Sequence, residues 1–131
     1  GRIMLRTLNR TVQSSFRTFR KEMEYTINLA DKVFAQLEHA SHGREAKASL
    51  GLIVGHVKSW VIDLEPIADQ DPVIQQMVWQ MKNAIGQLQD AQHCVEPYAF
   101  QVHPADVRYA QFKVKDVKRI LQGIERQLVR K

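Results

Sequence analysis

The sequence predicts an all-α protein that folds as an antiparallel four-helix bundle with a long basic N-terminal helix. Apolar residues recur at spacings of three and four along almost all of the 131 residues, which is the period of a helix with one buried face. No segment alternates apolar and polar residues with the period of two that a strand requires. Glycine or proline interrupts the pattern at three places, which leaves four amphipathic segments with short connections.

The first segment is the longest of the four. Its apolar stripe consists of Phe16, Phe19, Met23, Ile27, Ala30, Phe34 and Leu37. The helix is expected to span about 35 residues, or to bend near Ser14-Ser15. It ends at Ser41-His42-Gly43, where we expect Gly43 to be the C-terminal cap because glycine readily adopts the left-handed conformation of that position.

The second segment has an apolar seam made of Ala46, Leu50, Ile53, Val57, Trp60 and Leu64. It ends at Glu65-Pro66, because a residue before proline is displaced from the helical region. Gly51 and Gly55 lie four residues apart within this segment. That spacing either permits another helix to approach closely, or is simply tolerated at a cost of about 1 kcal/mol per glycine.

The third segment starts at Asp71-Pro72, with aspartate as the N-cap and proline as the first helical residue. Its seam is Ile74, Met77, Met81, Ala84, Leu88, Ala91 and Val95. Pro97 ends this helix, and a short linker, YAFQVH, covers residues 98–103. Pro104 then starts the fourth helix, with the seam Val107, Ala110, Val114, Val117, Leu121, Ile124 and Leu128.

The net charge of +5 is distributed unevenly along the chain. Residues 1–21 carry +6, residues 22–65 carry −3, residues 66–106 carry −4 and residues 107–131 carry +6. Both ends are therefore basic and the middle is acidic. Such asymmetry favours a nucleic acid or another acidic surface as the partner, although an uneven solvated surface would have the same composition.

The cations of the first and last segments each lie along one face of a helix. In the first segment the six cations fall within an arc of about 100°. In the last segment Arg108 and Lys115 fall within about 60° of three further arginines, opposite the apolar seam. The first and last helices of an up-and-down bundle are neighbours, so the two ends would form one basic patch. The residues predicted to bind nucleic acid are Arg2, Arg6, Arg10, Arg17, Arg20, Lys21, Arg119, Arg126 and Arg130.

Part of this patch has another explanation. Cations in the last turn of a helix interact favourably with the helix dipole, by about 0.3–1 kcal/mol each. The basic end of the fourth helix would therefore contain cations even without a ligand.

No residue pattern predicts catalysis, a metal site or a cofactor. His39 and His42 have a spacing that could hold a metal, but the sequence fixes no third ligand beside them. His93 and Cys94 are adjacent, so on a helix they point about 100° apart and cannot act as a base and its nucleophile. The chain contains no phosphate-binding glycine loop and no nucleophile elbow. No run approaches the roughly 18 apolar residues of a membrane span. We therefore expect a protein that is not an enzyme and does not span a membrane.

Two kinds of binding protein fit these features. In the first, the arginine-rich stripe binds the phosphates of nucleic acid, with double-stranded DNA as the expected form, and does not read sequence. In the second, the bundle is an adaptor or assembly module in the cytoplasm, and Trp79, Tyr109 and Phe112 anchor a protein partner. Binding to phosphates weakens steeply with salt, whereas binding in an apolar groove does not.

The stretch RIMLRTLNRTVQSSFRTFRK at residues 2–21, followed by a helical bundle, resembles the DNA-wrapping major coat proteins of filamentous archaeal viruses. In that family paired subunits stack helically, and their N-terminal helices enclose a duplex that is held in A-form. The resemblance implies a DNA-binding capsid protein, located in the virion, that works as one subunit of a filament.

The whole chain is expected to be a single helical domain, with residues 1–21 as a basic arm and residues 22–131 as the bundle. Leu5, Leu8 and Val12 continue the apolar stripe beyond the length that bundle helices of about 25 residues can cover. These side chains would pack against a neighbouring subunit. The sequence therefore predicts a homo- or hetero-oligomer.

Overall fold

The computed structural model describes residues 10–38, 43–95 and 104–129, with side chains at 19–38, 43–95 and 104–127. Helices account for almost all of this part of the chain, and no strand occurs within it, so the prediction of an all-α fold is confirmed. The beginning of the predicted N-terminal helix, at residues 2–9, lies outside it. The helices are α1 (Arg10–Leu37), α2 (Gly43–Leu64), the 3-10 helix η3 (Glu65–Gln70), α3 (Pro72–Val95) and α4 (Pro104–Val129).

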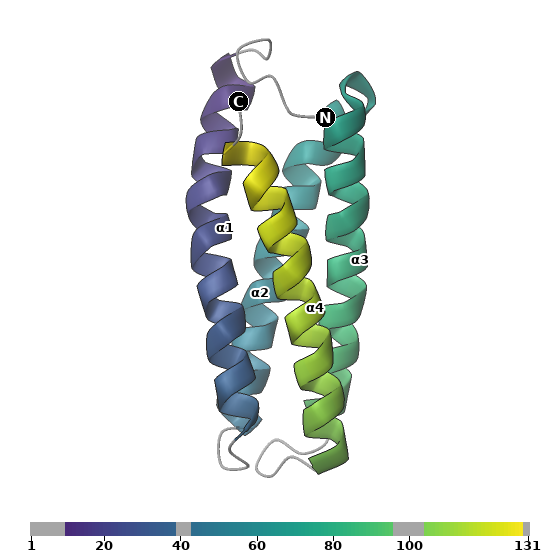
Figure 1. Ribbon diagram of the computed structural model, residues 1–131. Coiled ribbons are helices and arrows are strands. Elements are labelled where there is room, and N and C mark those ends of the chain that lie inside the picture. Colours follow the sequence, from purple (N-terminus) through teal and green to yellow (C-terminus); the bar gives the residue numbers. More distant parts are fainter. Residues whose placement is uncertain (1–9, 39–42, 96–103, 130–131) are drawn as a thin grey trace.

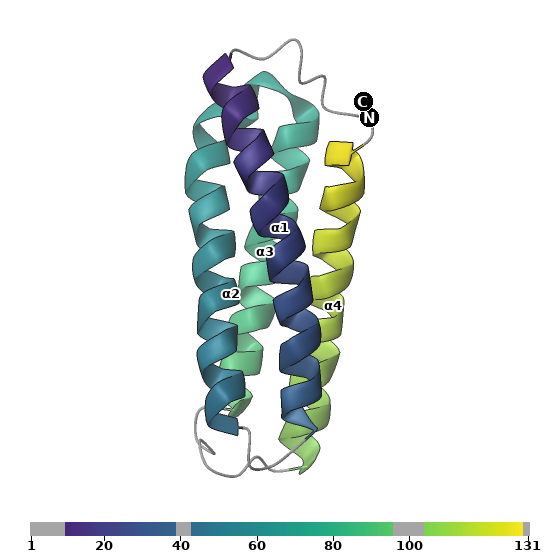
Figure 2. The same ribbon diagram turned by 90° about the vertical axis from the view of Figure 1, so that its left-hand side faces the viewer.

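The α-helices lie along one long axis, and each runs in the opposite direction to the one before it (Figures 1 and 2). The colour sequence descends through α1, rises through α2, descends through α3 and rises through α4. Each α-helix packs against the next in the chain, and α1 packs against α4 to close the ring. The N-terminal part of α1 and the C-terminal part of α4 therefore lie at the same end of the bundle.

The described members of the predicted seams form the hydrophobic core, whereas Phe16 and Leu128 lie outside the described side chains. Every member of the second and third seams is buried, from Ala46 to Leu64 on α2 and from Ile74 to Val95 on α3. Phe34 on α1 and Val107 on α4 are only half-buried and pack against the edge of the core. Val33 is also fully buried, because α1 contacts both α2 and α4 and therefore buries a face wider than one stripe.

The connection from α2 to α3 follows the sequence prediction. The α-helix ends at Leu64, η3 continues from Glu65 to Gln70, and Asp71 follows it. The Oδ1 atom of Asp71 accepts a hydrogen bond from the backbone N–H of Val73 at 2.8 Å, and its carbonyl accepts one from the N–H of Gln75 at 3.0 Å. Asp71 is therefore the N-cap of α3, an interaction that typically contributes about 1 kcal/mol.

The prediction that Gly43 caps the C-terminus of the first helix is wrong. Gly43 is the first residue of α2, and no described glycine has a positive φ. Glycine is enriched after the end of a helix and, less strongly, before the start of one, so the sequence did not distinguish the two positions. Gly51 and Gly55 are exposed, and a Cβ at Gly55 would meet no atom within 4 Å. Within the bundle these glycines are therefore tolerated and do not serve close helix packing.

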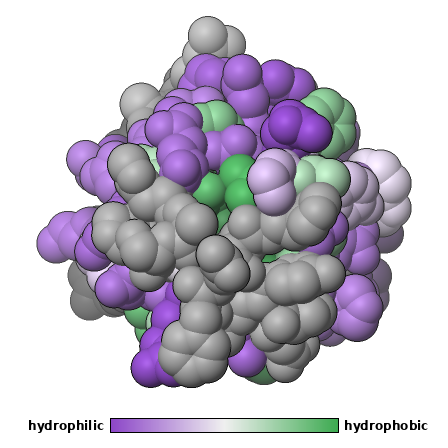
Figure 3. Space-filling model, turned by 90° about the horizontal axis from the view of Figure 1, so that it is seen from below, coloured by the Kyte–Doolittle hydropathy of each residue, from purple (hydrophilic) through white to green (hydrophobic). Residues whose placement is uncertain are grey.

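The described outer surface is mixed, because large hydrophobic side chains such as Ile62 and Trp79 are exposed among polar ones. Viewed from below, hydrophilic residues surround this end of the bundle and hydrophobic residues are visible toward the middle (Figure 3). Among the described residues, no helix combines the length and the apolar character needed to cross a membrane.

Candidate nucleic-acid interface

The predicted binding residues fall into three groups. Arg2, Arg6 and Arg130 lie outside the described residues, and Arg10 and Arg17 lie in α1 without described side chains. The side chains of the remaining residues can be placed. These are Arg20, Lys21, Arg119 and Arg126.

The structure brings cations from the two ends of the chain to one end of the bundle. Arg20 and Lys21 are on the N-terminal half of α1, and Arg126 is in the last turn of α4. These parts of α1 and α4 lie side by side (Figures 1 and 2). Lys21 and Arg126 are exposed and Arg20 is half-buried, so all three can contribute to a positive potential there.

The solvent-facing side of α4 carries one row of exposed basic and aromatic side chains. Each member lies three, four or seven residues after the previous one, so the row stays on one side of the helix. We call this row the α4 outer face. It consists of Arg108, Phe112, Lys115, Arg119 and Arg126.

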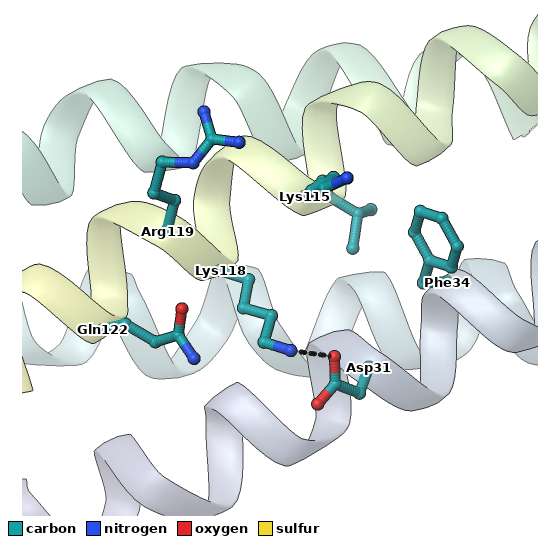
Figure 4. Close-up of a pocket in the computed structure, with 7 residues that line it drawn as sticks. Asp31, Phe34, Lys115, Lys118, Arg119 and Gln122 are labelled. Atoms are coloured by element: carbon teal, nitrogen blue, oxygen red, sulfur yellow. Dashed lines mark hydrogen bonds and ion pairs between the residues drawn. The ribbon is translucent and has the colours of Figure 1, made fainter.

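A groove runs between α1 and α4 beside the α4 outer face, with a volume of about 330 Å³. Phe34 and Val114 give it an apolar part. Lys115, Lys118 and Arg119 bring three positive charges, against one carboxylate in the lining, that of Asp31. Figure 4 shows Lys118 reaching across from α4 to Asp31 on α1. The groove is therefore positively charged along its α4 side.

The cations of this groove are not fixed by strong ion pairs. Nζ of Lys118 lies 2.5 Å from Oδ1 of Asp31, and Nη1 of Arg119 lies 3.4 Å from Oδ1 of Asp116 on the same helix. Both pairs contain side chains that are more than half exposed, and such surface ion pairs contribute about 0–1 kcal/mol. For Lys115 the described residues provide no ion pair. An incoming phosphate could therefore bind these side chains at little cost in stability.

The sequence analysis missed a polar network between α1 and α2. The buried Thr26 hydroxyl donates to the carbonyl of Glu22 at 2.7 Å, so its oxygen is left to accept the Nδ1–H of His56 at 3.0 Å. The indole N–H of Trp60 donates to Oε2 of Glu22 at 2.7 Å, and Phe19 packs edge-on against Trp60. These groups satisfy one another, so the network holds the two helices together. A threonine beside an apolar seam was the signal that could have revealed it.

Cys94 on α3 is a half-buried free cysteine. Burial raises the pKa of the Cys94 thiol, and the carboxylates of Asp106 and Asp90 raise it further, so the thiol is poorly suited to act as a nucleophile. Within the described ranges, no group of three histidine, cysteine or acidic side chains could hold a metal ion. His39 and His42 lie outside those ranges.

Comparison with protein-family models, with curated proteins and with solved structures gave no match to this chain. Exposed guanidinium and ammonium groups on adjacent helices suit an extended anion, because each can pair with a separate phosphate.

Proposed function

We propose that the protein is a structural subunit that coats nucleic acid through its phosphate backbone, without reading the sequence. Double-stranded DNA is the expected form. The observation that supports this proposal most directly is the position of Arg20, Lys21 and Arg126 at one end of neighbouring helices, where Arg126 belongs to the α4 outer face. Phosphate contacts position a protein on a duplex but carry no base information, so affinity should be nearly independent of sequence.

The proposed subunit is an antiparallel four-helix bundle whose basic N-terminal helix lies against the duplex. Arg2, Arg6, Arg10 and Arg17 continue the cationic row of α1 toward the start of the chain. The apolar residues near the same end, such as Leu5, would pack against a neighbouring subunit, as the resemblance to filamentous viral coat proteins implies. The protein would then be a capsid component of a virion.

An adaptor function is the second candidate, and a specific observation favours it. Leu52 and Ile62 on α2 and Trp79 on α3 are exposed large hydrophobic residues on helices other than α1 and α4. An exposed tryptophan is a common anchor for a protein partner. In this case the protein would work in the cytoplasm, and its binding would change little with salt.

A comparison of two triple variants tests the proposal. Replacing Lys115, Arg119 and Arg126 with alanine removes cations from the α4 outer face, whereas replacing Lys47, Lys58 and Lys82 removes the same charge from α2 and α3. The first variant should flatten the slope of log affinity for duplex DNA against log salt by about three, because three counterions fewer are released. The second variant should leave that slope unchanged. Equal changes in both variants would contradict the proposed interface.

A further inference from the structure

The α4 outer face exposes a phenylalanine in the middle of its cations. Phe112 is 62% exposed, although the helix buries Ala110 and Val114 on either side of it in sequence. The core of the bundle therefore does not use this ring. An aromatic side chain that is exposed among cations is available to a ligand that combines a planar apolar group with negative charge.

The spacing of the neighbouring cations defines the shape of such a ligand. Arg108 lies one turn before Phe112, and Lys115 and Arg119 lie one and two turns after it. At 1.5 Å per residue, Arg108 and Lys115 are about 10 Å apart along the helix, with the ring between them. The ligand that fits this row is linear, with negative charges on both sides of a flat group.

A nucleic acid strand with unpaired bases has this arrangement. Its phosphates carry the charge, and each unpaired base has a face on which an aromatic ring can stack. In a duplex the base faces are already stacked on one another, so the ring of Phe112 would find only backbone and base edges. The aromatic ring therefore distinguishes single strands from duplexes, whereas the cations attract both.

We propose that the α4 outer face binds single-stranded nucleic acid, with a base stacked on Phe112 and phosphates paired with Arg108, Lys115 and Arg119. This inference rests on the proposed binding of phosphates by the same cations, which attract a duplex as well. It adds that stacking on Phe112 makes this face bind a strand with unpaired bases more tightly than a duplex. Tyr109 is less available for stacking, because the ammonium group of Lys113 lies over its ring, 5.3 Å from the centroid.

The α3 helix provides a matched control for this test. Trp79 is 65% exposed, close to the value for Phe112, and the nearest cation on its helix, Lys82, is paired with Glu65. Gln75, Gln76 and Asn83 occupy the other positions one turn away. Trp79 is therefore an exposed aromatic side chain without a row of cations.

The experiment measures the affinity of the full chain for labelled oligo(dT) and for a duplex of the same length, at 50 mM salt. Phe112→Ala should weaken oligo(dT) binding by about 5- to 150-fold, which is the effect of losing one stacked base. Its affinity for the duplex, and the salt dependence of both complexes, should be unchanged because no cation is removed. Phe112→Leu should behave like Phe112→Ala, since leucine is apolar but cannot stack. Trp79→Ala should bind both forms like the wild type.

The outcomes separate this inference from the proposed function. If the wild type binds the duplex but Phe112→Ala leaves oligo(dT) affinity unchanged, the inference is overturned and the proposed function stands. Equal weakening for both forms, or full retention of affinity by Phe112→Leu, also overturns it. If the wild type binds neither form, both proposals are wrong.

Discussion

Helices α3 and α4 are neighbours of similar length, but the side chains on their outer faces differ in charge. Both bury a regular apolar seam in the same core. The 24 residues of α3 contain Lys82 and Asp90 as their charged side chains, with glutamine and asparagine at half of the other exposed positions. The 26 residues of α4 contain six cations and three carboxylates. One helix is almost neutral outside, and the other is strongly basic.

This difference shows which features the fold requires and which it does not. The bundle needs the inward seams, and α3 demonstrates that a helix of this bundle can pack with few charges on its surface. Six cations on one helix repel each other, and the exposed ion pairs that offset this repulsion contribute little. The core therefore does not require the basic character of α4, and the proposed nucleic-acid ligand would account for the part of it that the helix dipole does not.

The largest expected change in stability tests whether α3 and α4 contribute equally to the hydrophobic core. Leu88→Ala on α3 and Leu121→Ala on α4 should each lower the free energy of unfolding by about 2–5 kcal/mol, because both leucines are completely buried. Urea titrations followed by circular dichroism measure this change. A loss below about 1 kcal/mol for Leu121→Ala alone would mean that α4 is not an equal part of the core.

A smaller effect of opposite sign is expected at glycines on the two helices. Gly86→Ala on α3 should raise the free energy of unfolding by about 0.5–1 kcal/mol, because alanine favours a helix and its Cβ would meet no atom within 4 Å. Gly123→Ala on α4 should give a similar gain, since its Cβ would lie 3.9 Å from the flexible guanidinium of Arg126. Thermal denaturation would detect both, and a loss at either position would contradict the described packing.

The smallest expected effect on stability bears most directly on the comparison. Replacing Arg108, Lys115 and Arg119 with glutamine gives the α4 outer face the chemistry of α3. The free energy of unfolding should change by less than about 0.5 kcal/mol, because these side chains are exposed and Arg119 loses one surface ion pair. Urea titration measures this change, and duplex affinity at low salt should fall in the same variant. A large loss of stability would show that the cations are structural.

The sequence predicted the buried faces well because helical periodicity depends only on spacing along the chain. All seven members of the third seam are buried, as is Trp60 in the second. The Asp71 cap was equally accessible, since the N-cap and the following proline are a local signal. The spacing of residues along the chain does not predict which side chains of different helices contact each other. The contact between Asp31 and Lys118 joins residues 87 apart, and only the register of α1 against α4 brings them together.

In the candidate site, too, some features were predictable from the sequence and others depend on how the helices pack. Each residue of a helix is rotated by about 100° from the one before it, so spacing along the chain is enough to place Arg119 and Arg126 on one face of α4. Both residues were therefore predicted from the sequence. The groove beside them was not predicted, because it depends on Phe34 and Val114 from two helices. Phe112 was recognised as an exposed aromatic residue and interpreted as an anchor for a protein. Its position between the cations of the α4 outer face is the basis on which we propose an unpaired base as its ligand instead.

The most direct test of the central claim is a salt titration of duplex binding by the wild-type chain. With six to nine phosphate contacts, the slope of log affinity against log salt should be roughly −5 to −8. Replacing Arg6, Arg10 and Arg17 with alanine should flatten this slope by about three and leave helicity unchanged, because alanine is the stronger helix former. The absence of duplex binding at 50 mM salt, or an unchanged slope in the triple variant, would contradict the nucleic-acid function and favour the adaptor.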